Sequence, residues 1–264
     1  MLCQYDKERG QFNRVSVATI ANERRFYSPD VEAKLASLVE NPANVAIDKL
    51  RQGAAINADD REHLAIYIAT MIKRVPHSRH MARRLMPQAL ADTVEALKEL
   101  ISRAASENGL DATVAAKRLA EADAAAESFE RSPPPEVIER IRTPWPTEEM
   151  VQLVFGMTWR FVTTAGPSFF LTSDNPAFLF EGFGLGRPEA EFTFPISSAL
   201  ALHGSWQVGP SDTVITTNQR IVKELNRRIA RTATRFLYYH KREDWVASVC
   251  QQSDQTTLNR IMWS

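Results

Sequence analysis

The hydrophobic period of the sequence changes late in the chain. Before Ser168 the apolar residues recur three and four positions apart, as on one face of a helix; Leu64, Ile68 and Met71 are an example. After it they form short aromatic or branched runs separated by Gly, Pro, Asp and Asn, as in residues 191–194, which is typical of strands. We therefore predict an α+β fold, with a helical N-terminal half packed on a mostly antiparallel or mixed C-terminal sheet.

Several individual elements follow from the same patterns. The apolar stripe that starts after Asn57, a residue type that caps helices, predicts a core helix. The other expected elements are a hairpin with strands at 2–5 and 15–20, a buried helix over 147–164, and closing strands at 236–239 and 245–249.

A protruding helical hairpin is expected between the core helices. Leu90, Val94, Leu97 and Ile101 alternate at spacings of four and three, and a second Ala-rich helix follows a stop at Asn108-Gly109. We predict one domain over 1–264 with this hairpin inserted at about 86–130, and a possible internal boundary at the prolines of 132–135. Its Ala-rich faces suggest a helix partner, possibly a second copy of the chain.

Composition excludes several classes of protein. Lys and Arg number 32, as do Asp and Glu, so the formal net charge is zero and a polyanion binder charged over its whole surface is disfavoured. Two cysteines, Cys3 and Cys250, are too few for a disulfide framework or a thiolate zinc site. No long uncharged apolar run is present, and the first residues are charged rather than signal-like. A cytoplasmic protein with no membrane segment is expected.

The sharpest local feature is Ser173-Asp174-Asn175-Pro176, which ends an apolar strand. One interpretation is structural: Asp174 forms an Asx-turn and Pro176 holds Asn175 extended, which gives a stiff turn. The other is functional, because a carboxylate and an amide held at the end of a buried strand can ligate a hard cation or orient a substrate.

Two cationic runs offer a surface for an anionic partner. The first contains Arg79, Arg83 and Arg84 after a core helix. The second lies on an amphipathic helix whose basic side is expected to point outward, and it consists of Arg220, Lys223, Arg227, Arg228, Arg231 and Arg235. A solvated helix face explains the same residues without a partner. His77 and His80 are three apart, but no third metal ligand is apparent nearby in the sequence.

Several short segments of the chain carry a family resemblance when taken together. They are Tyr5-Asp6-Lys7, Arg25-Phe26-Tyr27, Val39-Glu40, Lys73-Arg74-Val75-Pro76, Phe170-Leu171-Thr172-Ser173-Asp174-Asn175-Pro176, Phe194-Pro195-Ile196 and Glu224-Leu225-Asn226. In this order they resemble the bacterial family known as domain of unknown function 4238. The opening His-Tyr-Val-Pro type motif that we associate with this family is absent, and the chain begins at the strand expected to follow it.

The resemblance implies a fold neighbourhood and no specific activity, but it brings four polar residues forward as one candidate site: Glu40, Arg74, Asp174 and Asn175. Arg74 and Asp174 each end an apolar element and need local compensation, so we expect them to approach one another or to share a polar neighbour. A structural ion-pair network explains these residues equally.

Two functional hypotheses follow. The first is a metal-assisted hydrolase of a phosphate-containing or nucleic-acid substrate: Asp174 ligates Mg²⁺ or acts as base, Glu40 assists, Asn175 orients the substrate and Arg74 neutralises developing charge. The second is a noncatalytic binding or regulatory protein, possibly associated with mobile DNA or defence, whose basic helices dock an acidic partner.

Overall fold

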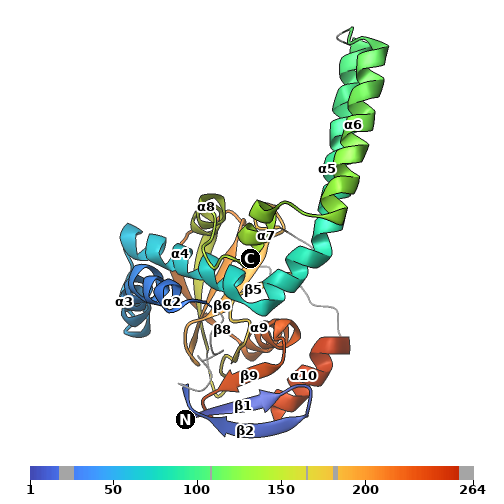
Figure 1. Ribbon diagram of the computed structural model, residues 1–264. Coiled ribbons are helices and arrows are strands. Elements are labelled where there is room, and N and C mark those ends of the chain that lie inside the picture. Colours follow the sequence, from blue (N-terminus) through green and yellow to red (C-terminus); the bar gives the residue numbers. More distant parts are fainter. Residues whose placement is uncertain (18–26, 108, 165, 181–183, 256–264) are drawn as a thin grey trace. The chain divides into compact units, whose positions relative to one another are not determined.

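The computed structural model describes residues 1–17, 27–107, 109–164, 166–180 and 184–255. It forms two compact units, one of Met1–Pro76 with Pro144–Ser264 and one of His77–Thr143. After a short N-terminal hairpin the first part of the chain is helical, and the later strands form two sheets, one of which includes that hairpin. The predicted α+β class is therefore confirmed (Figure 1). None of the helices in the described ranges is long and apolar enough to cross a membrane.

The first unit begins with β1 (Leu2–Asp6) and β2 (Gln11–Val15), followed by α2 (Pro29–Leu35), the π-helical turn η1 (Ala36–Glu40), α3 (Asn41–Arg51) and α4 (Ala58–Arg74). The predicted cap of α4 is confirmed. Asn57 Oδ1 accepts the backbone N–H of Asp60, whose side chain accepts the N–H of Asn57. This capping box fixes the start of the helix. Lys49 Nζ also binds the carboxylate of Asp60, at 2.7 Å.

A five-stranded sheet forms the centre of the first unit, in the order β5-β6-β7-β3-β8. Its strands are β3 (Thr158–Thr164), β5 (Phe178–Leu179), β6 (Glu191–Pro195), β7 (Leu200–Ser205) and β8 (Thr213–Thr217). All neighbouring pairs are antiparallel except β3 and β8, which are parallel.

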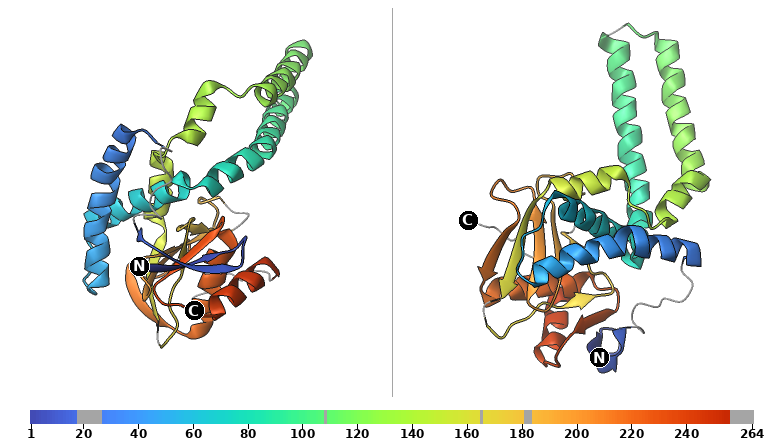
Figure 2. Two further views of the ribbon diagram at one scale, coloured as in Figure 1. Left: turned by 60° about the horizontal axis from the view of Figure 1, so that its bottom comes forward. Right: turned by 90° about the vertical axis from the view of Figure 1, so that its left-hand side faces the viewer.

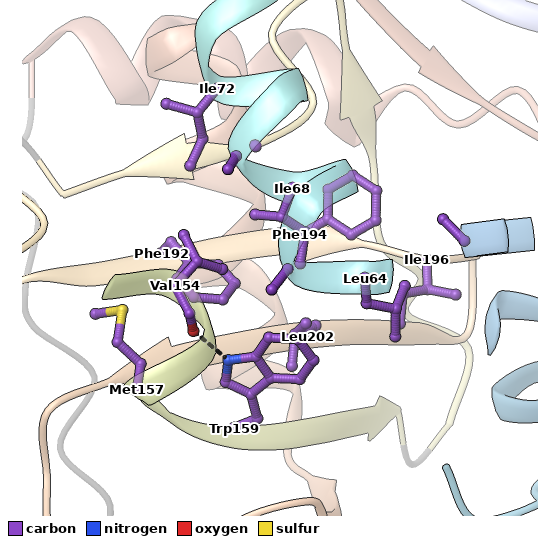
Figure 3. Close-up of a cluster of buried hydrophobic side chains, with 14 of the residues drawn as sticks. Leu64, Ile68, Ile72, Val154, Met157, Trp159, Phe192, Phe194, Ile196 and Leu202 are labelled. Atoms are coloured by element: carbon purple, nitrogen blue, oxygen red, sulfur yellow. Dashed lines mark hydrogen bonds between the residues drawn. The ribbon is translucent and has the colours of Figure 1, made fainter. Parts of the chain in front are cut away.

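One face of this sheet carries the main hydrophobic core. Trp159, Phe192 and Leu202 from the strands meet Leu64 and Ile68 of α4, with α3 and α8 (Glu148–Gly156) completing the cluster (Figure 3). The Trp159 indole N–H donates to the Val154 carbonyl at 2.9 Å, which satisfies the polar end of this buried ring. The predicted packing of α4 against the sheet is therefore confirmed.

The opposite face of the sheet is covered by α9 (Gln219–Thr232). Val222 and Leu225 of this helix pack with Val162 of β3 and Ala201 of β7. Side chains alternate along each strand, so Arg160, Glu191, Thr193, His203 and Ser205 lie on this same α9 side, next to the apolar contact. The α9 side therefore has an apolar half and a polar half.

A smaller four-stranded sheet has the order β2-β1-β9-β4, where β4 is Thr172–Ser173 and β9 is Phe236–Tyr239. Leu171, Leu237 and Ile229 of α9 form its core together with Val246 and Val249 of α10 (Trp245–Gln255). This sheet brings the first strand of the chain beside a strand more than two hundred residues later, since Tyr5 pairs with Leu237.

The second unit is the helical hairpin, with α5 (Pro76–Glu107), α6 (Ala112–Arg131) and α7 (Pro135–Arg142). The helices α5 and α6 run side by side (Figure 2). Lys98 of α5 pairs with Asp123 of α6 at 2.5 Å. Ala115 and Ala122 are the only buried hydrophobic residues of the described side chains in this hairpin. Its helices therefore cover far less apolar surface than those of the first unit.

Two predicted elements are wrong. Residues 158–164 form strand β3 and are not part of a helix. Their side chains alternate between the two faces of the sheet: Trp159 and Phe161 point to one face, and Arg160 and Val162 point to the other. Both faces are covered, and a strand buried on both sides has the continuous apolar character of a buried helix.

Residues 245–249, predicted as a strand, begin helix α10, in which Val246, Val249 and Cys250 share the buried face. The second strand of the N-terminal hairpin also starts earlier than expected, directly after the turn at Gly10, whose φ of +63° suits glycine. Residues 18–20 of the predicted strand lie outside the described residues.

Candidate functional site

The structure brings Glu40 and Arg74 together, two of the residues selected from the sequence. Arg74 Nη1 donates to Glu40 Oε1 at 2.8 Å, and Arg74 Nη2 lies 3.3 Å from Glu32 Oε2. The side chains of Arg74 and Glu40 keep 25% and 36% of their surface exposed, so water weakens this ion pair, which we expect to stabilise the fold by about 1 kcal/mol or less.

Asp174 is held by the backbone that follows α9. Its carboxylate accepts the N–H groups of Thr234, Arg235 and Phe236 at 2.8, 2.8 and 3.0 Å. Three consecutive amides therefore converge on one side chain, and both carboxylate oxygens are used. These bonds support the structural interpretation of the turn.

Asn175 is 4% exposed and its amide donates to the Thr232 carbonyl at 3.2 Å, while its backbone N–H donates to Ser173 Oγ. The bond to Thr232 satisfies a carbonyl in the last turn of α9, a position where helices leave carbonyls without an internal partner. Asn175 thus fixes the same end of the helix as Asp174.

Asp6, the last residue of β1, and Lys7, which follows it, also reach this end of α9. Lys7 Nζ donates to the carbonyls of Ala230 and Ala233 at 2.6 and 3.0 Å, and Arg235 Nη2 donates to Asp6 Oδ2 at 2.7 Å. The hydrogen bond from Arg235 lowers the pKa of the Asp6 carboxyl. A cation at the C-terminal end of a helix also interacts favourably with the helix dipole. We call Asp6, Lys7, Asp174, Asn175 and Arg235 the α9 junction.

Asn226, from the last segment of the family resemblance, links α9 to the strand before the turn. Its Oδ1 accepts the N–H of Leu171 at 2.9 Å and its Nδ2 donates to the Phe169 carbonyl at 2.8 Å. The side chain is 1% exposed. It makes the hydrogen bonds to two buried backbone groups that a neighbouring strand would otherwise make. Three separate motif segments therefore meet around α9.

The expected contact between Arg74 and Asp174 is not found in the described part of the chain. Arg74 is bound to the acids of α2 and η1, whereas Asp174 is bound to the backbone before β9. The four selected residues thus lie in two separate groups, Glu40 with Arg74 and Asp174 with Asn175.

The polar half of the five-stranded sheet, formed by Arg160, Glu191, Thr193, His203 and Ser205, is a third group. The sequence analysis did not select it. Arg228 of α9 extends to it and donates to Glu191 Oε2 at 2.7 Å, and His203 Nε2 lies 3.6 Å from the same oxygen. Glu191, His203 and Arg228 are each at most 2% exposed. Three strands and a helix therefore enclose a charged cluster.

Electrostatics in this cluster favours a charged Glu191 beside a neutral His203. Burial raises the pKa of the Glu191 carboxyl, but its interactions with His203 and Arg228 outweigh burial and lower the pKa overall. Burial lowers the pKa of His203 despite the opposing effect of Glu191. Arg228 also lies over the Phe180 ring, with its guanidinium carbon 4.8 Å from the ring centroid.

One sequence signal for the polar half was present. In Glu191-Phe192-Thr193-Phe194 and in Leu202-His203-Gly204-Ser205, polar residues occupy every second position, which places them on one sheet face. The missing information was that α9 covers this face. Arg228 was expected on the outward side of α9 and that prediction is wrong, because it is the helix position that points to Glu191.

The side chains expected to bind an anionic partner differ in their exposure. Arg84 is exposed, whereas the side chains of His77, Arg79, His80 and Arg83 lie outside those that the structure describes. Arg227 and Arg231 are half-buried on α9. Within the described residues no three His, Cys, Asp or Glu side chains are grouped so that they could hold a metal ion, and neither Cys3 nor Cys250 forms a disulfide.

Comparison with known proteins adds a family and no activity. Neither the curated proteins nor the solved structures contain a match to the chain. The family model described as Protein of unknown function (DUF4238) matches residues 1–243. That range includes both groups of selected residues and the polar half. The chain belongs to the DUF4238 family.

Proposed function

We propose that the protein is a noncatalytic binding protein that contacts the phosphate backbone of a nucleic acid through the outward side of α9. The observation that carries this proposal is a line of cations along that side. Arg220 and Lys223 are exposed, and Arg227 and Arg231 follow at half-buried positions one and two turns later. Because the whole chain has a net charge of zero, this concentration of charge is local.

One of the two half-buried cations, Arg227, already has an acidic partner. Arg227 Nη1 pairs with Glu224 Oε2 at 3.1 Å, which partly neutralises its charge. The contact with phosphate is therefore expected to depend mainly on Arg220 and Lys223, which lie in the first turns of the helix.

A metal-assisted hydrolase is the alternative, and the contacts of its candidate residues give it less support. Both oxygens of Asp174 accept backbone N–H groups, the amide of Asn175 donates to Thr232, and Glu40 is paired with Arg74. Each of these groups already has a structural partner. The polar atoms expected to act on a substrate are those that hold the fold together.

The binding proposal is tested by fluorescence anisotropy with labelled duplex DNA and single-stranded RNA over a range of salt concentrations. The double variant Arg220→Glu/Lys223→Glu is expected to weaken binding at least about tenfold at low salt and to reduce the salt slope, because it removes two phosphate contacts. Lys117→Glu/Arg118→Glu is the matched control, since both residues are exposed on α6.

Three results would overturn this proposal: no binding by the native protein, an equal loss in the control variant, or binding only to an acidic protein. The hydrolase alternative is checked separately by calorimetric titration with Mg²⁺ and Mn²⁺ and by phosphodiesterase assays. Turnover by the native protein that disappears in a folded Asp174→Ala variant would establish the alternative instead.

A further inference from the structure

Strand β8 forms one edge of the five-stranded sheet, since β3 is its only neighbouring strand in the part of the chain that the structure describes. An edge strand carries backbone N–H and C=O groups without a strand partner, and proteins protect such an edge by short length, charge or proline. β8 has five residues, all of them uncharged and none of them proline. The strand therefore has none of these three protections.

The other three edges of the two sheets are protected. β5, at the far edge of the same sheet, has two residues, and so has β4, at one edge of the smaller sheet. β2, at the other edge of the smaller sheet, has five residues but carries the charged Arg14. Among the strands that the structure describes, the long and uncharged edge is therefore particular to β8.

β8 is exposed to solvent and held at both ends. Val214 is 64% exposed, and Thr216 is exposed on the same face of the sheet. Before the strand, the Asp212 N–H donates to the Trp159 carbonyl at 2.8 Å, and after it Asn218 caps α9. A strand that is already extended and fixed loses little conformational freedom when a second strand pairs with it.

The backbone groups of β8 that face away from β3 follow from its contacts. The Ile215 carbonyl accepts the Thr163 hydroxyl of β3 at 3.3 Å, so it points toward β3. Thr164 donates its N–H on the β7 side, so the backbone of Thr163 faces β8, in agreement with this direction. Successive residues of a strand bond to opposite sides, and the N–H and C=O groups of Val214 and Thr216 therefore point to the open edge.

A second copy of β8 fits these four groups. In an antiparallel pair centred on Ile215, Val214 of each copy lies opposite Thr216 of the other, and each such pair exchanges two hydrogen bonds. All four outward groups of both strands are then bonded. The flanking Asp212 comes opposite Asn218, so no like charges face each other across the two-fold axis.

We propose that two copies of the protein pair through their β8 edges and join their five-stranded sheets into one continuous sheet. The pairing occupies the edge of each copy, so the assembly closes as a dimer and does not grow into a filament. The two-fold axis is perpendicular to the sheet, which leaves α9 of both copies on the same side. The dimer does not depend on the proposed contact with nucleic acid.

The size of the contact predicts a weak dimer. Stable protein interfaces bury roughly 1,200 Å² or more, and one pair of short strands is a small interface by that measure. We expect a Kd of about 10–100 µM. Sedimentation velocity of the full chain without nucleic acid, from about 1 to about 300 µM, should therefore show a shift from the mass of one copy to that of two.

Val214→Lys is expected to weaken the dimer at least about tenfold, because it places a charge on the edge of both copies. Val208→Lys is the matched control, since it makes the same change at a fully exposed valine before β8, and it should dimerise as the native protein does. Val214→Pro is a second variant: it removes an N–H that only the dimer uses, at an edge position that tolerates proline. It should weaken the dimer as well.

Hydrogen exchange detects the contact without a substitution. The amides of Val214 and Thr216 should exchange at least about tenfold more slowly at about 300 µM than at about 1 µM. The proposal is overturned if the native protein keeps the mass of one copy throughout, or if both Val214 variants dimerise as it does. A dimer that is abolished by Leu97→Glu/Leu100→Glu in the hairpin, with these two amides unprotected, would place the interface there and overturn it too.

Discussion

The α9 junction and the polar half of the five-stranded sheet are both polar, both partly or wholly buried, and both touch α9, but their hydrogen bonding differs. In the junction, Lys7 binds two helix carbonyls and Asp174 binds three backbone amides. In the polar half, the hydroxyls of Thr193 and Ser205 have no partner in the described chain. The comparison sets polar groups whose hydrogen bonds complete the fold beside polar groups that make no such bond.

The largest expected effect tests whether polar residues around α9 are structural. Asn226→Ala should lower the free energy of unfolding by about 2–5 kcal/mol, because it leaves the Leu171 N–H and the Phe169 carbonyl buried without a partner. Urea unfolding measures this loss. Asn218→Ala serves as the control, since it removes only the exposed cap of α9 and should cost about 1 kcal/mol.

Asn226→Asp sharpens the same result. It keeps an oxygen that can accept the Leu171 N–H but removes the amide that donates to Phe169, so we expect it to be destabilising as well. A native-like unfolding curve for Asn226→Ala would mean that these bonds do not stabilise the fold. It would contradict the claim that the polar residues around α9 are structural.

The dependence of stability on pH tests the junction at Asp6. The hydrogen bond from Arg235 lowers the pKa of Asp6 below its ordinary 3.8 in the folded protein. This contribution is therefore fully present above the ordinary pKa and is lost as the pH falls through the folded pKa. Urea unfolding at neutral pH and in the acid range should show a smaller acid loss for Asp6→Asn than for the native protein.

Asp60 supplies a comparison outside the junction. Its pKa is lowered chiefly by the hydrogen bond from Lys49, so Asp60→Asn should also reduce the acid loss. If neither substitution alters the pH dependence, the charged bonds at these two helix ends do not contribute to stability in solution.

Local opening of the helical hairpin is expected to have the smallest effect on global stability. All six residues of β7 are buried, whereas α6 buries only Ala115 and Ala122, so the hairpin can open without disrupting the first unit. Hydrogen exchange of the full chain should show α6 amides exchanging at least about a hundredfold faster than those of β7. Exchange in α6 that is as slow as in β7 at low protein concentration would contradict this.

The same hydrogen-exchange measurement, repeated at several protein concentrations, tests whether the hairpin self-associates. Leu97, Leu100 and Val114 are 45%, 59% and 43% exposed, and the sequence led us to expect a helix partner for this unit, possibly a second copy. If copies associate through the hairpin, α6 amides should become more protected as concentration rises while β7 amides stay unchanged. Protection that does not depend on concentration would argue against self-association there.

How much of this could be predicted from the sequence depends on whether the information is local. The cap at Asn57 and the helical hairpin follow from neighbouring residues, and both were predicted. Residues 158–164 were predicted as helix. Strand β3 lies inside the sheet and is buried on both faces, so its sequence has the continuous apolar character of a buried helix. The sequence analysis selected Asp174, but its partners lie sixty residues away, at Thr234–Phe236, and no local pattern points to them.

The polar half was missed for a similar reason. Alternation in β6 and β7 indicates a polar face, and a polar face is usually a solvated one. Only the packing of α9 over that face, with Arg228 turned inward to Glu191, makes it a buried cluster. Burial of a polar face is a tertiary property that neither strand encodes alone.

The most direct test of the account is a pair of urea unfolding curves, for Asp174→Ala and for Thr193→Val. We predict that Asp174→Ala loses about 3 kcal/mol or more, because three backbone amides lose their acceptor, and that Thr193→Val stays within about 1 kcal/mol of the native protein or is more stable. A tolerated Asp174→Ala together with a strongly destabilised Thr193→Val would contradict the account.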